Sequence, residues 1–196
     1  MEQIRIINAV QDDAPMIADA IMDAVGEEIV ESLAGERSRT VVHDVFERLA
    51  RLDNSQYSYL NTRIAVTPDG TKAGVCISYD GNRLLELRKS FFAEACKEFG
   101  WNMTTEEMDS MPGETCGKEF YLDTLATLPA YRHRGIGKAL IEDATLKASR
   151  AGLPLGLLVS DNNPQARSLY ESMGFRFVGR RPFAGEEMSN LRLKHE

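Results

Sequence analysis

Three segments in the first half of the chain alternate apolar and polar residues, as half-buried strands do. They cover residues 4–9, 57–67 and 71–79. The last two are separated by Thr67-Pro68-Asp69-Gly70, and an Asp-Gly pair between two alternating runs is typical of a tight turn. We therefore predict one early strand followed, later in the chain, by a β-hairpin.

Other segments of the first half repeat their apolar residues at intervals of three and four, which predicts amphipathic helices. The clearest cover residues 17–25, 41–49 and 83–100. Residues 27–39 are acidic and contain a glycine, so we expect a short helix and a loop there. Residues 101–117 show no clear period. Their methionines either line an adaptable pocket or fill gaps beneath a loose loop.

The second half begins with a strand-like run at residues 121–128. Pro129 ends this run, because proline has no amide hydrogen to give to a strand ladder. A basic turn with two glycines, Arg132–Lys138, follows the strand. Apolar residues then continue with helical spacing over residues 139–148. The chain thus passes from a strand through a basic turn directly into a helix.

A nearly continuous apolar run at residues 153–159 predicts a strand that is buried on both faces. A polar, cap-like cluster precedes a helix predicted over residues 165–173, and a glycine follows it as a C-terminal cap. Phe175 begins another strand. The final strand is expected at residues 187–193, after a loop over residues 180–185.

The turn Arg132–Lys138 has the features of an anion-binding site. A glycine-bearing turn that opens a helix leaves several backbone amides unpaired at the positive end of the helix dipole. Gly135 and Gly137 have no Cβ, so a phosphate can approach the backbone closely. The Walker pattern fails here for lack of its first glycine and its Ser or Thr. The dinucleotide pattern fails for lack of its third glycine.

The pattern that remains resembles the pyrophosphate loop of the GNAT superfamily of N-acetyltransferases, which bind acetyl-CoA. It reads Arg132-x-x-Gly135-x-Gly137 and follows Leu125-Ala126-Thr127-Leu128-Pro129-x-Tyr131. A second GNAT-like pattern lies at the expected distance and reads Asn163-x-x-Ala166-x-x-Leu169-Tyr170-x-x-x-Gly174-Phe175. With both motifs in the correct order, the chain is identified as a member of this superfamily. The specific motifs cover residues 125–175, and the order of elements agrees over about residues 4–193.

The resemblance implies an α/β fold with a twisted, mixed central sheet of about six to seven strands flanked by helices. Its fourth and fifth strands would splay apart and hold acetyl-CoA, the cosubstrate, in the cleft between them. Backbone groups of Leu125, Ala126 and Thr127 would bind the pantetheine arm, and an amide there would hold the developing oxyanion. Asn163 would contact the cofactor from the fifth-strand side, with a simple helix cap as the structural alternative. The pyrophosphate would be bound by Arg132, His133, Arg134, Gly135, Ile136, Gly137 and Lys138.

The implied reaction is acetyl transfer to a primary amine by direct attack in a ternary complex. Tyr170 matches the position whose phenol protonates or hydrogen-bonds the leaving thiolate. A phenol pKa of about 10 makes it a donor at neutral pH. The structural alternative is that Tyr170 is a core aromatic residue. Some relatives carry a catalytic glutamate where this chain has Leu158. Asp123 is therefore the candidate catalytic carboxylate, with Glu119 on the same strand face and Tyr121 expected on the other. Many amines also lose their proton to water, so no dedicated base is required.

Composition and charge limit the classes of partner that we expect for this chain. The chain has 196 residues and is 43% hydrophobic, enough for a single domain with a sizeable core. A net charge of -7 disfavours nucleic acid as a partner. No apolar run is long enough to cross a bilayer, and no signal-peptide core is present, so we expect no membrane partner and a cytoplasmic location. Cys76, Cys96 and Cys116 are widely spaced without a metal-ligand pattern, and we expect free thiols and no metal.

We expect one domain, residues 1–196, with an insertion at residues 81–117 that is long for a minimal GNAT domain. If this insertion is functional, it is a lid or specificity element. The expected acceptor is a small-molecule amine, and a cationic one suits an acidic chain. Peptide or protein N-acetylation and a non-catalytic acyl-CoA-binding or sensing domain are alternatives, and a structural domain without a ligand is a third. The chain is expected to be a monomer or a homodimer.

Overall fold

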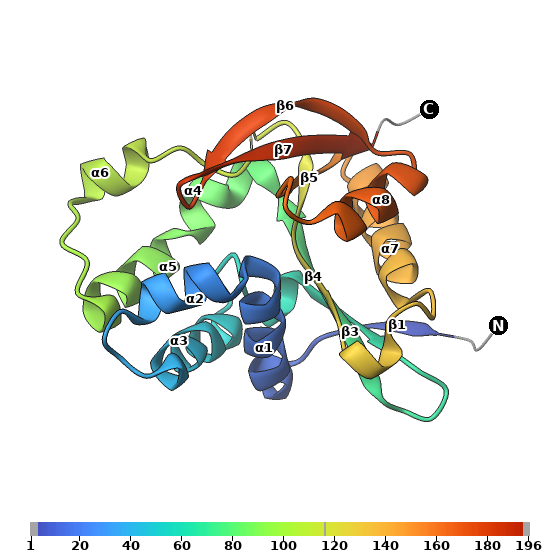
Figure 1. Ribbon diagram of the computed structural model, residues 1–196, viewed down its shortest axis with the longest axis horizontal. Helices are drawn as coiled ribbons and strands as arrows, with labels where there is room; N and C mark the ends of the chain where they lie inside the picture. Colours follow the sequence, from blue (N-terminus) through green and yellow to red (C-terminus); the bar gives the residue numbers. More distant parts are fainter. Residues whose placement is uncertain (1–3, 116, 194–196) are drawn as a thin grey trace.

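The computed structural model describes residues 4–115 and 117–193. A seven-stranded mixed sheet, in the order β1-β2-β3-β4-β5-β7-β6, forms its centre, and helices cover both faces (Figure 1). The predicted α/β architecture is thereby confirmed. Cys76 and Cys96 are free thiols, and the third predicted free thiol, Cys116, lies outside the described residues. No helix of the described chain is both long and apolar enough to pass through a membrane.

The strands follow the predicted segments closely, with β2 shorter than expected at its start. Their bounds are β1 Arg5–Asn8, β2 Thr62–Val66, β3 Lys72–Asp80, β4 Phe120–Thr127, β5 Leu155–Val159, β6 Arg176–Phe183 and β7 Glu186–Leu193. The helices are α1 Ala14–Val25, α2 Glu27–Ala34, α3 Arg39–Arg51, α4 Leu84–Leu87, α5 Lys89–Glu94, α6 Thr105–Ser110, α7 Ile136–Arg150 and α8 Pro164–Ser172.

The predicted hairpin is formed by β2 and β3, and its inward side chains belong to the first of two cores. Ile64 lies opposite Val75 in the antiparallel register, and both are buried. The apolar faces of α1 and α3 pack into the same core, with Ile17 and Phe46 fully buried. Amphipathic periodicity therefore placed these helices correctly on the sheet.

The helix α7 lies on the opposite face of the sheet (Figure 1). A second core lies beneath it, in which Leu140 and Ile141 are completely buried. The start of α7 approaches β3 closely because residue 74 is glycine. A Cβ at Gly74 would lie 2.6 Å from Cγ2 of Ile136, which is closer than carbon atoms pack. Gly74 thus fixes the position of the α7 N-terminus, and with it the turn that precedes the helix.

The two parallel strands β4 and β5 meet at one short seam. They pair at Phe120–Leu155 and Tyr121–Gly156, and no further pairing between them occurs in the described chain. Beyond the seam β4 continues to Thr127 while pairing with β3 alone, and β5 pairs with β7 on its other side. The strands therefore diverge from the seam, as the GNAT resemblance predicts.

A buried carboxylate holds this seam together. Glu119 is completely buried, and its side chain accepts hydrogen bonds from Thr115 Oγ1 at 2.8 Å and from Arg192 Nη2 at 2.8 Å. The carboxylate lies against the backbone of Gly156, where a Cβ would overlap its Oε2 atom. Glu119 therefore stabilises the packing of β4, β5 and β7 against one another.

A β-bulge interrupts β4 beside the cleft. Ile77 of β3 pairs with Thr124, whereas the next residue, Ser78, pairs with Leu122, so Asp123 is an extra residue on β4. A bulge re-aims side chains and changes which residues share a face beyond it. Simple alternation therefore does not hold along the whole of β4.

Two predictions for the connecting segments need correction. The single helix expected at residues 83–100 is instead α4 and α5, which meet at Arg88, followed by a π-helical turn at Ala95–Phe99. Within residues 101–117, the short helix α6 begins with a capping box between Thr104 and Glu107. The insertion is therefore more ordered than a loose loop.

The loop expected at residues 180–185 is wrong. β6 continues to Phe183 and turns into β7 through Ala184 and Gly185, whose φ angles of 49° and 85° suit a two-residue hairpin turn. Pro182 suggested a loop, but β6 is the last strand of the sheet, and an edge strand accommodates proline.

Candidate active site

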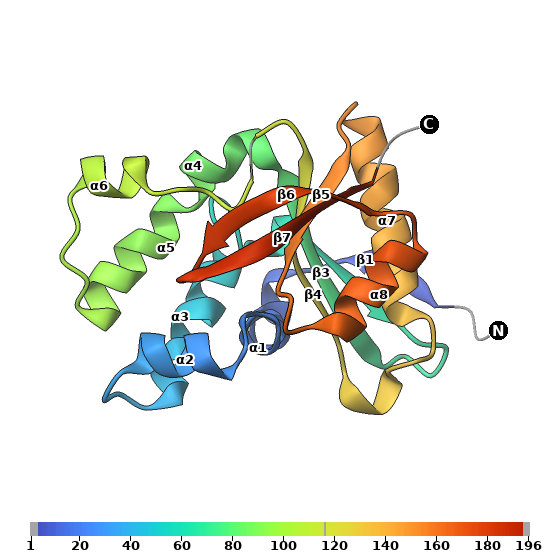
Figure 2. The ribbon, with the colours of Figure 1, turned by 45° about the horizontal axis from the view of Figure 1, so that its top comes forward.

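A cleft of about 1610 Å³ opens where β4 and β5 diverge. One end is lined by the turn before α7, by the start of α8 and by Tyr170. The other end is lined by residues from α1, α2, α3 and α5 and from the segment after α6. These two groups of helices lie on opposite sides of the sheet in both ribbon views (Figure 1, Figure 2).

The first end is formed mainly by backbone. Gly135 is the N-cap of α7 with φ 82°, a left-handed conformation that favours glycine. The amides of the first helical turn, Ile136 to Lys138, have no partner within the helix. Arg132 Nε donates to the carbonyl oxygen of Thr127 at 3.3 Å, which ties the turn to the end of β4. An anionic group would meet several amides and the positive end of the α7 dipole here.

Most of the predicted cofactor residues lie together along this end of the cleft. The lining includes Leu125, Ala126, Thr127, Arg132, His133, Gly135, Ile136, Gly137, Lys138 and Asn163. Arg134 is absent from it, and its guanidinium lies instead over the ring of Tyr131, 5.0 Å from the ring centroid. A Cβ at Gly137 would make a van der Waals contact with Leu169 Cδ2 at 3.4 Å.

Asn163 has the capping role that was its structural alternative. Its Oδ1 accepts a hydrogen bond from the backbone amide of Ala166 at 3.0 Å, which satisfies the first turn of α8. The residue also lines the cleft. Capping therefore does not remove it from the predicted cofactor site.

Tyr170 lies on α8 with its side chain buried, and its ring centroid is 5.6 Å from that of Phe175. Its hydroxyl has no hydrogen-bond partner among the described residues, although the side chain lines the cleft. Burial raises the pKa of Tyr170 above its ordinary value, and coupling to the buried Cys76 side chain adds to this rise. The phenol therefore stays protonated at neutral pH and is suited to donating a hydrogen bond.

At the opposite end, Asp123 is held by three donors. It accepts hydrogen bonds from Tyr79 Oη at 2.6 Å, from Thr124 Oγ1 at 3.1 Å and from Gln56 Nε2 at 3.4 Å. Burial raises the pKa of Asp123, and these three hydrogen bonds oppose that rise. The prediction that Tyr121 lies on the other face is wrong, because its ring centroid is 5.9 Å from that of Tyr79 and the charge of Asp123 raises its pKa.

The second predicted carboxylate, Glu119, is not part of the cleft lining. Its oxygens bind Thr115 and Arg192, and the side chain is completely enclosed. The alternation that placed it beside Asp123 on one strand face does not bring the two carboxylates into one site.

A different carboxylate, Glu114, lies in the cleft with Asp123. Its Oε2 atom is buried without a hydrogen-bond partner. Burial, followed by the charge of Asp123, raises the pKa of Glu114 from its ordinary 4.5 to about 7. Sequence reasoning missed this residue, because it follows Pro112-Gly113 in a segment without periodicity. The available signal was an acidic residue directly after Pro112-Gly113, six residues before the first residue of β4.

Aromatic side chains form the walls around the two carboxylates. The ring centroids of Phe46 and Tyr57 are 5.3 Å apart, those of Phe46 and Phe91 are 6.4 Å apart, and those of Phe91 and Trp101 are 6.0 Å apart. All four residues line the cleft. Aromatic rings around a negative charge form a suitable environment for a cationic amine.

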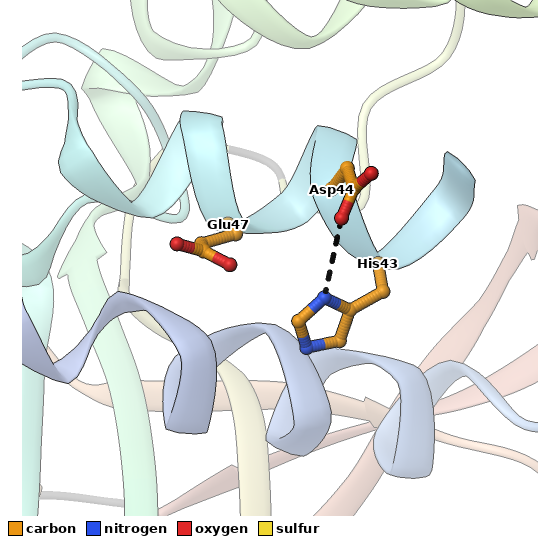
Figure 3. Close-up of side chains that lie close together, drawn as sticks. All are labelled: His43, Asp44 and Glu47. Carbon is orange, nitrogen blue, oxygen red and sulfur yellow. Dashed lines mark ion pairs between the residues drawn. The ribbon is translucent and has the colours of Figure 1, made fainter. Parts of the chain in front are cut away.

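Another group of polar side chains lies on α3, where ligand atoms of His43, Asp44 and Glu47 are within 4.8 Å of one another (Figure 3). These residues are absent from the cleft lining. His43 also lies 3.4 Å from the carboxylate of Asp19, and Glu47 pairs with Arg51 at 2.8 Å. Ordinary ion pairing on the surface accounts for this cluster.

Comparison with known proteins agrees with this geometry. The family model described as an acetyltransferase (GNAT) domain matches residues 89–177, which include both walls of the cofactor end. A solved structure described as an acetyltransferase is 25% identical over 98% of this chain and 100% of its own, with a TM-score of 0.75. The chain is a GNAT-family N-acetyltransferase.

Two further structures share the fold of this GNAT protein. An N-acetyltransferase from Staphylococcus aureus Mu50 is 22% identical over 96% of this chain and 100% of its own, with a TM-score of 0.76. The NatC complex bound to Gag peptide and CoA matches at 21% identity over 100% of both chains, with a TM-score of 0.56. No curated protein sequence gave a significant match. GNAT acetyltransferases use acetyl-CoA, so the enzyme class and the acyl donor follow from the family.

Proposed function

We propose that this GNAT enzyme acetylates the primary amine of a small cationic molecule and that residues 1–196 act as one domain. The observation that carries the proposal is the acidic, aromatic end of the cleft, where Asp123 and Glu114 lie among aromatic rings. An ammonium group gains from both the carboxylate charge and the rings there. An amine bound at this end lies in the same cleft as the turn that is suited to the anionic part of CoA.

The cofactor residues divide between backbone and side-chain roles. The amides of residues 133–138 hold the pyrophosphate, with Arg132 and Lys138 adding positive charge. The free edge of β4 at residues 125–127 holds the pantetheine arm, and Asn163 borders it from α8. Acetyl-CoA brings an activated thioester, and the β4 amides stabilise negative charge on its carbonyl oxygen. No metal is required by this scheme.

Tyr170 donates a hydrogen bond to the departing sulfur. A thiol has a pKa of about 8.5, well below that of a buried phenol, so the phenol stabilises the thiolate without giving up its own proton at equilibrium. Asp123 supplies fixed negative charge at the acceptor end, and its use as the general base stays a prediction. The segment 81–117 carries Arg88, Trp101 and Glu114 into the cleft and acts as the specificity element.

Thermal unfolding with acetyl-CoA and thiol release across an amine panel test this proposal together. A ligand at a hundred times its dissociation constant adds about 2.7 kcal/mol, which raises the Tm of a chain of this size by roughly 5–10 °C. We expect this shift, with turnover on small alkylamines rather than on peptides. A shift without turnover on any amine would favour a non-catalytic acyl-CoA sensor, and no shift would remove the cofactor assignment.

A peptide amine is the second candidate acceptor. The structural similarity to the NatC complex, which binds Gag peptide, supports it at the level of fold. Turnover on peptide N-termini with none on small amines would establish it instead.

A further inference from the structure

Glu114 is the one carboxylate of the cleft with a buried oxygen that has no hydrogen-bond partner in the described chain. Asp123, in contrast, receives three hydrogen bonds from Tyr79, Thr124 and Gln56. A buried carboxylate oxygen without a donor is costly unless a ligand supplies the missing hydrogen bond. An ammonium group of the acceptor is a donor of the right charge.

The segment that carries Glu114 is held firmly on its N-terminal side. Arg88 is buried, and its Nη2 atom donates to the carbonyl oxygens of Met108 at 2.8 Å and Met111 at 2.9 Å. Next to Glu114, a Cβ at Gly113 would lie 2.9 Å from Leu84 Cδ2, so the chain passes very close to α4.

The C-terminal side of Glu114 is equally well anchored. Thr115 donates to Glu119 at 2.8 Å, and a Cβ at Gly81 would lie 2.7 Å from Thr115 Oγ1. The backbone of Glu114 is therefore fixed against α4 and the start of β4. A group that receives a proton in catalysis needs such a fixed position relative to the reacting nitrogen.

We propose that Glu114 is the general base that takes a proton from the ammonium group of the acceptor, while Asp123 positions that group by its charge. The assignment rests on the proposed amine acetyltransferase function. It places the base before β4, on the segment between α6 and β4, rather than on the strand itself.

The acceptor arrives as an alkylammonium ion and gives one proton to the Glu114 carboxylate, which frees the nitrogen lone pair. The nitrogen forms its bond to the acetyl carbon as the carbon–sulfur bond breaks, and the electron pair of that bond leaves with the sulfur. The second nitrogen proton neutralises the thiolate through solvent, and Glu114 returns its proton to water, so one proton is released per turnover.

The groups around Glu114 set the pH at which it acts. Burial and the Asp123 charge raise its pKa to about 7. A hydrogen bond from its own backbone amide, the guanidinium of Arg88 and a hydrogen bond from Gln56 oppose that rise. Tyr57, Tyr79 and Tyr121 also face Glu114, and their pKa values are raised well above 10, so they stay neutral. Glu114 is thus ionised, and active as a base, above about pH 7.

The pH dependence of kcat/KM for the best alkylamine of the panel tests this assignment. We expect wild-type activity to rise with an apparent pKa of about 7. Glu114→Gln should lose this rise and about a hundred-fold in kcat/KM, the lower range for removal of a general base. A β,β-difluoro analogue of the same amine, which is mostly unprotonated at pH 8, should recover most of the lost activity in the variant at that pH.

Glu106→Gln, an exposed change on α6, is the matched control and should behave as wild type. Acetyl-CoA affinity and Tm of Glu114→Gln show whether the variant is folded. A ¹³C NMR titration of the glutamate carboxylates in the wild-type protein measures the pKa of Glu114 directly. A Glu114 resonance that titrates at its ordinary pH, or an intact pH profile in Glu114→Gln, would overturn the assignment alone. Absence of turnover on every amine would overturn it together with the proposed function.

Discussion

The two ends of the cleft are constructed in opposite ways. The cofactor end is a continuous turn, residues 132–138, that offers backbone amides and a helix dipole. The acceptor end collects side chains from distant parts of the chain, including Phe46 on α3, Trp101 after the π-helical turn and Glu114 before β4. One end binds through the main chain and the other through side chains.

This difference separates what is common to the family from what is particular to this enzyme. Backbone amides accept an anion regardless of most side-chain changes, provided that the turn keeps its shape. A site formed by side chains changes its charge or shape whenever one of those side chains is substituted. We therefore expect substitutions at the cofactor end to act through backbone conformation, and substitutions at the acceptor end to act through charge.

The largest effect on turnover is expected at Tyr170, which lines the cofactor end of the cleft. Tyr170→Phe removes the free hydroxyl and should lower kcat by about a hundred-fold, as does the loss of one catalytic hydrogen-bond donor elsewhere. Acetyl-CoA affinity and KM for the amine should remain near wild type, since the ring and its packing on Phe175 are kept. Steady-state kinetics with isothermal titration of acetyl-CoA check this. Unchanged turnover would remove Tyr170 from the chemistry.

Asp123→Asn should act on the acceptor end alone. Loss of this charge should lower kcat/KM for a cationic amine by about ten-fold, which corresponds to about 1.4 kcal/mol. Because the Asp123 charge raises the pKa of Glu114, the rising limb of the pH profile should move to lower pH in the variant. Asp44→Asn, on the exposed side of α3, is the control. A limb that stays in place would show that the two carboxylates do not interact.

Two glycines at opposite ends of α7 distinguish backbone strain that weakens cofactor binding from strain that lowers stability alone. Gly135 and Gly152 have φ angles of 82° and 67°, and a Cβ at either position would meet no atom within 4 Å. Alanine at either site should cost about 1 kcal/mol through backbone strain. Only Gly135→Ala should also weaken acetyl-CoA binding, by about five-fold, because only that strain lies in the turn. Equal binding in both variants would argue against the turn as the pyrophosphate site.

The smallest expected effect is a change in how the folding stability depends on pH, and it arises from Glu114. Glu114 has a folded pKa raised from 4.5 to about 7, so the folded state binds more protons in that interval and stability falls as pH rises through it. Glu114→Gln should remove this fall. After allowance for partial exposure, the difference is about 1 kcal/mol, or roughly 2–4 °C in Tm at pH 8 relative to wild type. Scanning calorimetry of both proteins at pH 5 and pH 8 measures it, and equal slopes would contradict it.

The sequence predicted the cofactor end far better than the acceptor end, for physical reasons. A turn such as Arg132–Lys138 is local, so its glycines and basic residues appear together in the sequence. Alternation itself puts Tyr121 on the same face as Asp123, so the error for Tyr121 came from misapplying the pattern. The bulge at Asp123 could not be predicted, because it depends on the pairing of β4 with β3, which no local pattern records. Glu114 was missed because it lies in an aperiodic segment, and its environment arises from tertiary contacts with Arg88 and Gln56.

The buried contact between Glu119 and Gly156 has a consequence for how this sequence can diverge. While a glutamate occupies position 119, any side chain at position 156 overlaps its carboxylate. A smaller residue at position 119 must therefore come first, and it would remove the carboxylate to which Arg192 donates. These three positions, far apart in the sequence, form one mutational unit, and homologues should change them jointly or keep all of them.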